Sequence, residues 1–343
     1  PWSAGAKRRR SAWRPSAPRR ADAGLRGMKH IPRIAAGIGI LLLVAAAALV
    51  AFAWAPDRPP EALVSRWAPP PSRFIALGGM QVHLRDEGAR DDPEPIVLLH
   101  GTSASLHTWE GWVRVLKAGH RVISVDLPGF GLTGPAPDGR YDIAAYARFV
   151  VDLLDALKVQ RAVLAGNSLG GYVAWKTGVD HPQRVSRLIL VDAAGYAFAP
   201  ESVPLGFRLA QSPALAPLMA HLLPRGMIES SVRNVYGDPS RVTAELVDRY
   251  YELTLRAGNR AALFARFGQT RSGEFERQVV QVKQPTLILW GGRDRLIPPE
   301  YARRFRQDIA GSTLVMFDAL GHVPQEEDPA ATVAAVRTFL DRH

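Results

Sequence analysis

The chain has 343 residues, of which 47% are hydrophobic and 22% charged, a composition that supports a folded core and excludes wholesale disorder. It has no cysteine, which excludes disulfide scaffolds, thiolate metal sites and catalytic thiols. The net charge of +11 is concentrated in residues 1–33, a basic tail with ten Lys and Arg against one acid, Asp22. The other 310 residues carry only +2, which argues against nucleic acid as a partner.

Residues 34–54, which follow the basic tail, contain no charged side chain. As a helix they would extend roughly 31 Å, enough to cross a hydrocarbon core of about 30 Å. We expect a single transmembrane anchor with a cytoplasmic N-terminus and a periplasmic or extracellular catalytic domain, because basic flanks stay in the cytoplasm. A cleaved signal peptide is the alternative, since small-x-small patterns end at Ala53 and Ala55.

Residues 55–72 contain six prolines. This composition favours extended polyproline geometry, so we expect a semi-rigid linker between the anchor and the rest of the chain. The globular domain is expected to occupy residues 73–343, where no internal repeat is visible.

The globular domain alternates short apolar runs with helical patterns. Residues 74–77 and 80–85 flank Gly78-Gly79, which indicates a hairpin. Further runs lack polar alternation, as is typical of strands buried on both faces of a parallel sheet; they are residues 96–99, 122–125, 162–165, 188–191, 286–290 and 313–317. Helical stripes such as residues 143–157 lie between them. We therefore predict a mostly parallel, doubly wound α/β sheet.

The strand pattern disappears between the runs at 188–191 and 286–290. Only helix-like stretches remain there, such as residues 242–255. We expect a helical cap over about residues 195–279. Its apolar side chains are candidates either for an acyl pocket or for ordinary packing: Leu215, Leu218, Met219, Leu222, Leu223, Phe264 and Phe267.

The run at 162–165 is followed by the sequence Gly166-Asn167-Ser168-Leu169-Gly170, a Gly-x-Ser-x-Gly motif that opens an apolar helix. This strand–turn–helix context holds a serine on a strained turn with its hydroxyl exposed. A side chain at either glycine would clash with the reversing backbone. Ser168 is therefore the candidate nucleophile.

Ligands of doubly wound sheets bind beyond the carboxyl ends of the strands, and two further candidates follow such ends. Asp294 follows the run at 286–290, and His322 follows the run at 313–317. A serine hydroxyl becomes a good nucleophile when a base whose pKa lies near neutral pH takes its proton. A carboxylate orients that base and stabilises its charged form. Asp192, which ends an earlier strand, is the alternative acid.

The run at 96–99 is followed by a glycine turn, His100-Gly101-Thr102-Ser103. This turn can aim the N–H of Thr102 at the oxyanion of a tetrahedral intermediate, with the N–H of Leu169 as second donor. We expect Ser103 and Trp109 as possible substrate contacts. His100 is expected to have a structural role.

These motifs, with Asp126-Leu127-Pro128-Gly129-Phe130-Gly131 after the next strand, resemble the α/β-hydrolase superfamily over residues 73–343. The similar branch is the capped one, which includes cofactor-free haloperoxidases, meta-cleavage C–C hydrolases, dehalogenases, epoxide hydrolases and esterases. Dehalogenases and epoxide hydrolases attack with aspartate, whereas this chain has Ser168. Meta-cleavage hydrolases usually have Trp after the catalytic histidine, where this chain has Val323. The resemblance implies that Asp126 anchors its loop.

The sequence predicts a membrane-anchored serine hydrolase that cleaves a small-molecule carboxylic ester with an apolar group through an acyl-enzyme. A serine triad needs no metal and no organic cofactor, and we expect none. A C–C bond hydrolase of meta-cleavage type would use the same triad. A non-catalytic, membrane-tethered binding module is the alternative from another class. The oligomeric state stays open.

Overall fold

The computed structural model describes residues 31–212, 214 and 221–342. Residues 1–30 of the basic tail and the cap candidates Leu215, Leu218 and Met219 lie outside these residues. The chain divides into two compact units, Pro1–Phe52 and Ala53–His343.

Helix α1 (Ile31–Ala53) accounts for the described part of the first unit. Its segment Ala35–Ala53 is long and apolar enough to cross a membrane, a test that a signal sequence near an N-terminus also passes. Leu41 and Leu43 are about two-thirds exposed, at 68% and 71%. Exposed apolar side chains of this kind are unfavourable in water unless an apolar partner covers them.

The second unit is built on an eight-stranded sheet of order β1-β2-β4-β3-β5-β6-β7-β8. The strands are β1 (Arg73–Leu77), β2 (Met80–Glu87), β3 (Ile96–Leu99), β4 (Val122–Val125), β5 (Ala162–Asn167), β6 (Val185–Val191), β7 (Thr286–Gly291) and β8 (Thr313–Phe317). β2 pairs antiparallel with β1 and β4, and all other pairs are parallel. The predicted mostly parallel, doubly wound sheet is confirmed.

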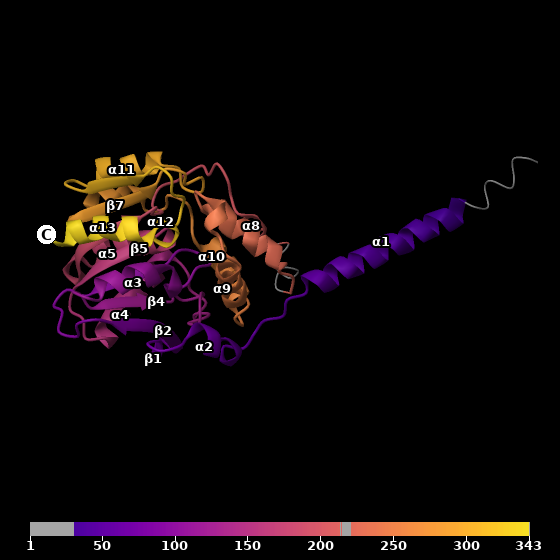
Figure 1. Cartoon of the computed structure of the whole chain (residues 1–343), viewed down its shortest axis with the longest axis horizontal. Helices are drawn as coiled ribbons and strands as arrows, with labels where there is room; N and C mark the ends of the chain where they lie inside the picture. Colours follow the sequence, from indigo (N-terminus) through magenta and orange to yellow (C-terminus); the bar gives the residue numbers. More distant parts are fainter. Residues whose placement is uncertain (1–30, 213, 215–220, 343) are drawn as a thin grey trace, which may run out of the picture. The chain divides into compact units, whose positions relative to one another are not determined.

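Helices cover both faces of this sheet (Figure 1). In β3, Val97 and Leu99 pack into one apolar cluster, and Ile96 and Leu98 into another. The first cluster includes side chains of α4 (Ile143–Ala156), α5 (Leu169–Asp180) and α11 (Glu300–Asp308); the second includes α3 (Glu110–Leu116) and α13 (Pro329–Leu340). Because both faces of the strand are buried, its sequence shows no polar alternation.

Between β6 and β7 the described residues form no strand and several helices, which build the predicted cap. These helices are α6 (Leu205–Ala210), α8 (Arg225–Val235), α9 (Ala244–Thr254) and α10 (Asn259–Gln269). Figure 1 shows α8, α9 and α10 close together. The end of α10 is tied to the sheet domain by Gln269, whose amide accepts from Tyr141 N at 2.7 Å and donates to Gly139 O at 2.8 Å. The cap helices thus lie over the strand ends at a defined place.

The proline-rich linker is not an extended spacer. It contains helix α2 (Glu61–Trp67), which begins after Pro60, where a proline's φ of −56° already suits a helix. Leu63 and Trp67, four residues apart, are buried together against Leu253 of α9. The prediction of an extended linker was wrong. Leu63 and Trp67 are the buried residues of α2, and two apolar residues four apart are too short a pattern to predict a helix in a segment rich in proline.

Candidate active site

Ser168 lies between β5 and α5 with φ +54° and ψ −113°, a conformation that costs a residue with a side chain about 1–3 kcal/mol. The flanking glycines make this turn possible. A Cβ atom on Gly166 would lie 2.1 Å from Gly170 O, and one on Gly170 would lie 2.0 Å from Leu99 O. The turn therefore presents the serine at the carboxyl ends of the central strands, as the motif predicts.

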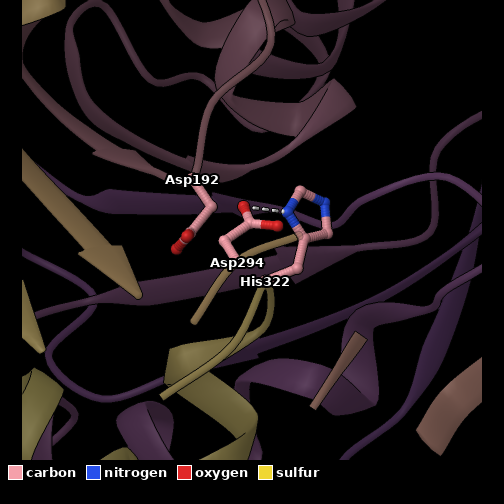
Figure 2. A group of neighbouring side chains, drawn as sticks. All are labelled: Asp192, Asp294 and His322. Carbon is pink, nitrogen blue, oxygen red and sulfur yellow. Dashed lines mark hydrogen bonds and ion pairs between the residues drawn. The ribbon is translucent and has the colours of Figure 1, made fainter. Parts of the chain in front are cut away.

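Asp294 and His322 are brought together from the ends of β7 and β8. Asp294 Oδ2 lies 2.6 Å from His322 Nδ1. Figure 2 marks this bond with a dashed line. The other oxygen of Asp294 accepts from the N–H groups of Leu296 and Ile297 at 2.8 and 3.0 Å. His322 Nε2 is buried without a hydrogen-bond partner among the described residues, and its ring lines the same cavity as Ser168. Asp294 thus orients the imidazole ring, and Nε2 is the nitrogen that can accept a proton.

Asp192 lies beside Asp294 but does not bond to His322 (Figure 2). Its Oδ1 accepts from Gly291 N at 2.9 Å, and its Oδ2 has no partner among the described residues. Burial and the neighbouring Asp294 carboxylate raise the pKa of Asp192 well above its ordinary value. Because Asp192 makes no hydrogen bond to His322, the geometry favours Asp294 as the partner of the histidine.

Asp192, Asp294 and His322 each offer a ligand-type atom, and these atoms lie within 4.8 Å of one another. Two ligands of a tetrahedral zinc ion at about 2.0–2.2 Å would be separated by roughly 3.3 Å. The 2.6 Å between Asp294 Oδ2 and His322 Nδ1 is shorter than that and fits a charge-assisted hydrogen bond.

The predicted oxyanion donors flank the serine. Thr102 and Ser103 line the cavity that Ser168 shares with His322. Gly101 allows this approach, because a Cβ atom there would lie 3.2 Å from Ser168 Cβ. Leu169 is the first residue of α5, and N–H groups of a helix's first turn have no partner within the helix.

Two supporting residues escaped the sequence analysis. Asn167, inside the serine motif, donates from Nδ2 to His322 O at 2.9 Å and so links the serine turn to the histidine loop. Glu327 of α12 (Pro324–Glu327) accepts from the N–H groups of Gly321, Gly237 and Asp238 at 2.7–2.9 Å. The role of Asn167 could have been inferred from the sequence, because a polar residue in a buried turn needs a hydrogen-bond partner. Nothing local in the sequence points to Glu327.

His100 and Asp126 have the structural roles that we expected. His100 Nδ1 donates to Gly101 O at 2.7 Å, and its Nε2 accepts from Leu127 N at 3.0 Å. Burial lowers the pKa of His100, which keeps the ring neutral. Asp126 accepts from the N–H groups of Leu106 and Leu132 at 2.7 and 2.8 Å and so anchors its loop.

Trp109 does not lie where we expected it. Its side chain is fully buried, with its ring centroid 4.9 Å from that of Trp112 in the apolar cluster beneath α3 and α13. It lines no cavity next to Ser168 among the described residues. The expected contact with substrate is therefore wrong, because the short helix Leu106–Trp109 turns this ring toward the sheet face instead of the strand ends.

The cavity beside Ser168 and His322 has a volume of about 110 Å³ and is mainly apolar. Of the predicted pocket residues, Leu223 and Phe264 line it, together with Met227 and Ile228. Leu222 instead pairs with Trp54 in a β-bridge, and Phe267 lines a second cavity. Arg260 is the one Lys, Arg, Asp or Glu among the described lining residues, and it is paired with Asp57 at 2.5 Å.

The family follows from comparison with known proteins. Residues 94–329 match the family model of the alpha/beta hydrolase fold. The chain belongs to the α/β-hydrolase family. The predicted superfamily is thereby confirmed, and the chain is a hydrolase.

Two sequence relatives and one solved structure are similar to this chain over most of its length. A 2-hydroxy-6-oxo-2,4-heptadienoate hydrolase of Pseudomonas putida is 30% identical over 78% of this chain and 95% of the relative. A 2-hydroxymuconate semialdehyde hydrolase of a Pseudomonas species is 30% identical over 80% and 95%. The solved structure of a membrane phospholipase A is 26% identical with a TM-score of 0.68, and the match covers 90% of this chain and 98% of that one.

Proposed function

We propose that this α/β-hydrolase forms an acyl-enzyme on Ser168. His322 Nε2 takes the proton of the serine hydroxyl, Asp294 stabilises the resulting imidazolium, and the N–H groups of Thr102 and Leu169 hold the oxyanion. His322 then protonates the leaving group and activates the water that clears the acyl-enzyme. The observation that carries this proposal is the 2.6 Å bond between Asp294 and His322 in the cavity wall that Ser168 shares.

For the bond that is cleaved, our first candidate is a carboxylic ester with an apolar acyl group. The cavity beside the triad is lined by aliphatic and aromatic side chains, and its arginine is neutralised by Asp57. Such a lining accepts a hydrocarbon chain and gives no partner to a charged one. The membrane phospholipase A, an ester hydrolase by its name, also resembles this chain over most of its length.

The second candidate is hydrolysis of a carbon–carbon bond in a vinylogous diketone. Both curated relatives at 30% identity are named for dienoate or semialdehyde substrates of this kind, so sequence similarity favours this candidate over the ester. The same serine attacks a ketone carbon, and the leaving group is a carbanion stabilised by conjugation. Val323, beside the histidine, lies in the cavity wall.

We further propose that α1 anchors the protein in a membrane, with the catalytic unit on the periplasmic or extracellular side. The phospholipase match covers 90% of the chain, more than residues 73–343 alone can supply, so it extends into the segment before residue 73. Protease accessibility in intact spheroplasts tests this topology, because the catalytic unit would be digested only if it is exported.

The bond is identified by comparing kcat/KM of the full chain in detergent on p-nitrophenyl acetate, butyrate, octanoate and palmitate with kcat/KM on a ring-fission dienoate. A higher value on an ester supports the first candidate, and a higher value on the dienoate supports the second. A folded protein that neither turns over any of them nor reacts with a fluorophosphonate would be a binding module.

Ser168→Ala is expected to lower kcat on the better substrate by at least about 10⁴-fold, since the nucleophile is lost. The thermal unfolding midpoint should not fall, because alanine keeps the Cβ atom and the substitution removes only the hydroxyl oxygen. The paired measurement is turnover and a melting curve on the same preparation. Retained turnover in a folded variant would contradict the mechanism.

A further inference from the structure

A second cavity of about 380 Å³ opens on the catalytic serine from another side. It shares Thr102 and Ser168 with the apolar cavity and includes Leu169, so it reaches the proposed oxyanion donors. Arg266 and Arg271 lie in its wall, whereas no Asp or Glu does among the described residues. The two cavities meet at the reacting centre and differ in charge.

Arg266 is the unusual residue of this second cavity. It lies in α10 and is only 8% exposed. Among the described residues its Nε has no hydrogen-bond partner and no acid pairs with its guanidinium. Its guanidinium carbon lies 5.2 Å from the centroid of the Phe267 ring. Burial lowers the pKa of Arg266, but an arginine stays protonated. An unpaired buried charge is unfavourable in a structure unless something else binds it.

The same helix offers a direct comparison. Arg260, two turns earlier, is equally buried but is paired with Asp57 at 2.5 Å. The chain thus neutralises one buried arginine of α10 and leaves the other without an acid. Because Arg266 faces a cavity that also receives the N-terminal end of α5, the helix dipole adds to its positive potential.

We infer that Arg266 binds an anionic oxygen group of the substrate, a carboxylate or a phosphate, on the part that leaves Ser168. This inference rests on the proposed function and deepens it. The apolar cavity holds the acyl group, the second cavity holds the anionic part, and the cleaved bond lies between them at Ser168. The substrate is therefore amphiphilic, with an apolar acyl end and an anionic leaving end.

The reaction balances with this placement. Ser168 Oγ bonds to the acyl carbon as its proton passes to His322, and the bond to the anionic alcohol breaks as His322 protonates the leaving oxygen. The alcohol leaves with its carboxylate or phosphate unchanged. Water then attacks the acyl-enzyme by the reverse sequence of proton transfers.

The test compares esters that share a butyryl group and differ in charge. One pair is the butyrate ester of 4-hydroxybenzoate and that of 4-hydroxybenzamide; the other is the butyrate ester of glycerol 3-phosphate and that of glycerol. With the full chain in detergent, Arg266→Met should lower kcat/KM on the preferred anionic ester by about 10- to 100-fold and change the neutral partner by less than about threefold. The pair with the larger preference distinguishes carboxylate from phosphate.

Two further variants make the result specific. Arg266→Lys keeps the charge without the planar fork and should recover part of the preference. Arg303→Met, the same change at an exposed position of α11, should leave all four rates as they are. Equal losses on charged and neutral esters in Arg266→Met, or no loss on either, would overturn the inference.

A binding measurement separates failure of this inference from failure of the proposed function. The thermal unfolding midpoint of Ser168→Ala is measured with inorganic phosphate and with 4-hydroxybenzoate. The anion that binds at Arg266 should raise this midpoint, and adding Arg266→Met should abolish the rise. If no ester is hydrolysed but the Arg266-dependent rise is present, the ester proposal fails and the anion site stands. If esters are hydrolysed without charge preference and no anion raises the midpoint, the anion site fails alone.

Discussion

Two carboxylic acids lie side by side at the centre of this site, and their surroundings give them different roles. Asp294 receives hydrogen bonds from two backbone N–H groups besides its bond to the His322 ring. Asp192 receives one backbone N–H and is buried against Asp294. Two adjacent buried carboxylates do not both ionise readily, and Asp192 is the one whose pKa burial and its neighbour raise.

This division predicts the ranking of two conservative variants. Asp294→Asn should lower kcat by about 10⁴-fold, because the amide favours the wrong histidine tautomer and cannot stabilise the imidazolium. Asp192→Asn should lower kcat by less than about tenfold, since an amide resembles the protonated acid in shape and hydrogen bonding. Steady-state rates on one substrate decide the ranking, and the reverse order would make Asp192 the acid.

The raised pKa of Asp192 also predicts a pH dependence of stability. The folded state keeps a proton that an unfolded aspartic acid releases above about pH 4, so the free energy of unfolding decreases as pH rises from there toward the raised pKa. Asparagine has no such proton. Denaturant curves of wild type and Asp192→Asn between pH 4 and 8 should show an advantage for Asp192→Asn that grows with pH. A constant difference would contradict this assignment.

At the scale of elements, the cap and the histidine loop form one hydrogen-bonded assembly. His322 N donates to Val235 O at the end of α8 at 2.8 Å. Glu327 accepts from Gly321 in the loop and from Gly237 and Asp238 in the cap. The position of His322, the proposed base, is therefore coupled to the cap.

Removal of this carboxylate should affect both parts. Glu327→Ala leaves three N–H groups without their acceptor and should lower the free energy of unfolding by about 2–5 kcal/mol. It should also lower kcat, because the backbone of His322 loses its support. Chemical denaturation and kinetics measure the two effects. Glu274→Ala, at an exposed position, is the control and should change stability by less than about 0.5 kcal/mol.

At the scale of the whole molecule, residues 53–72 are part of the catalytic unit. Arg58 exchanges backbone hydrogen bonds with Leu255 and Ala257 in the cap, at 2.6 and 2.8 Å. Trp67 Nε1 donates to Glu252 at 2.7 Å. The chain that follows α1 is thus bound to the cap instead of separating it from a membrane.

Truncation tests this assignment. A chain that starts at Ala53 should melt close to the full chain, whereas a chain that starts at Arg73 loses the burial of Leu63 and Trp67. At about 1.5–3 kcal/mol for each buried side chain, its melting temperature should fall by about 5–15 °C. Differential scanning calorimetry of both forms gives the answer. Equal midpoints would show that the segment is a spacer after all.

The sequence alone was sufficient for the fold and for the chain order of Ser168, Asp294 and His322. Buried strands leave uninterrupted apolar runs, and a strained serine turn needs glycines on both sides, so both features are written in neighbouring residues. The predicted strands at residues 96–99, 122–125 and 313–317 have the same ends in the structure.

Only the tertiary structure could decide which acid meets His322, where Trp109 points and what α2 packs against. Asp294 and His322 are 28 residues apart in the chain, Trp109 packs in one cluster with Val333, and Leu63 packs against Leu253. These side chains meet only because the chain folds back on itself. The isolation of Arg266 belongs here too. Whether a charged side chain is paired depends on every residue that surrounds it in the folded structure. A local sequence pattern therefore cannot show that Arg266 has no acidic neighbour.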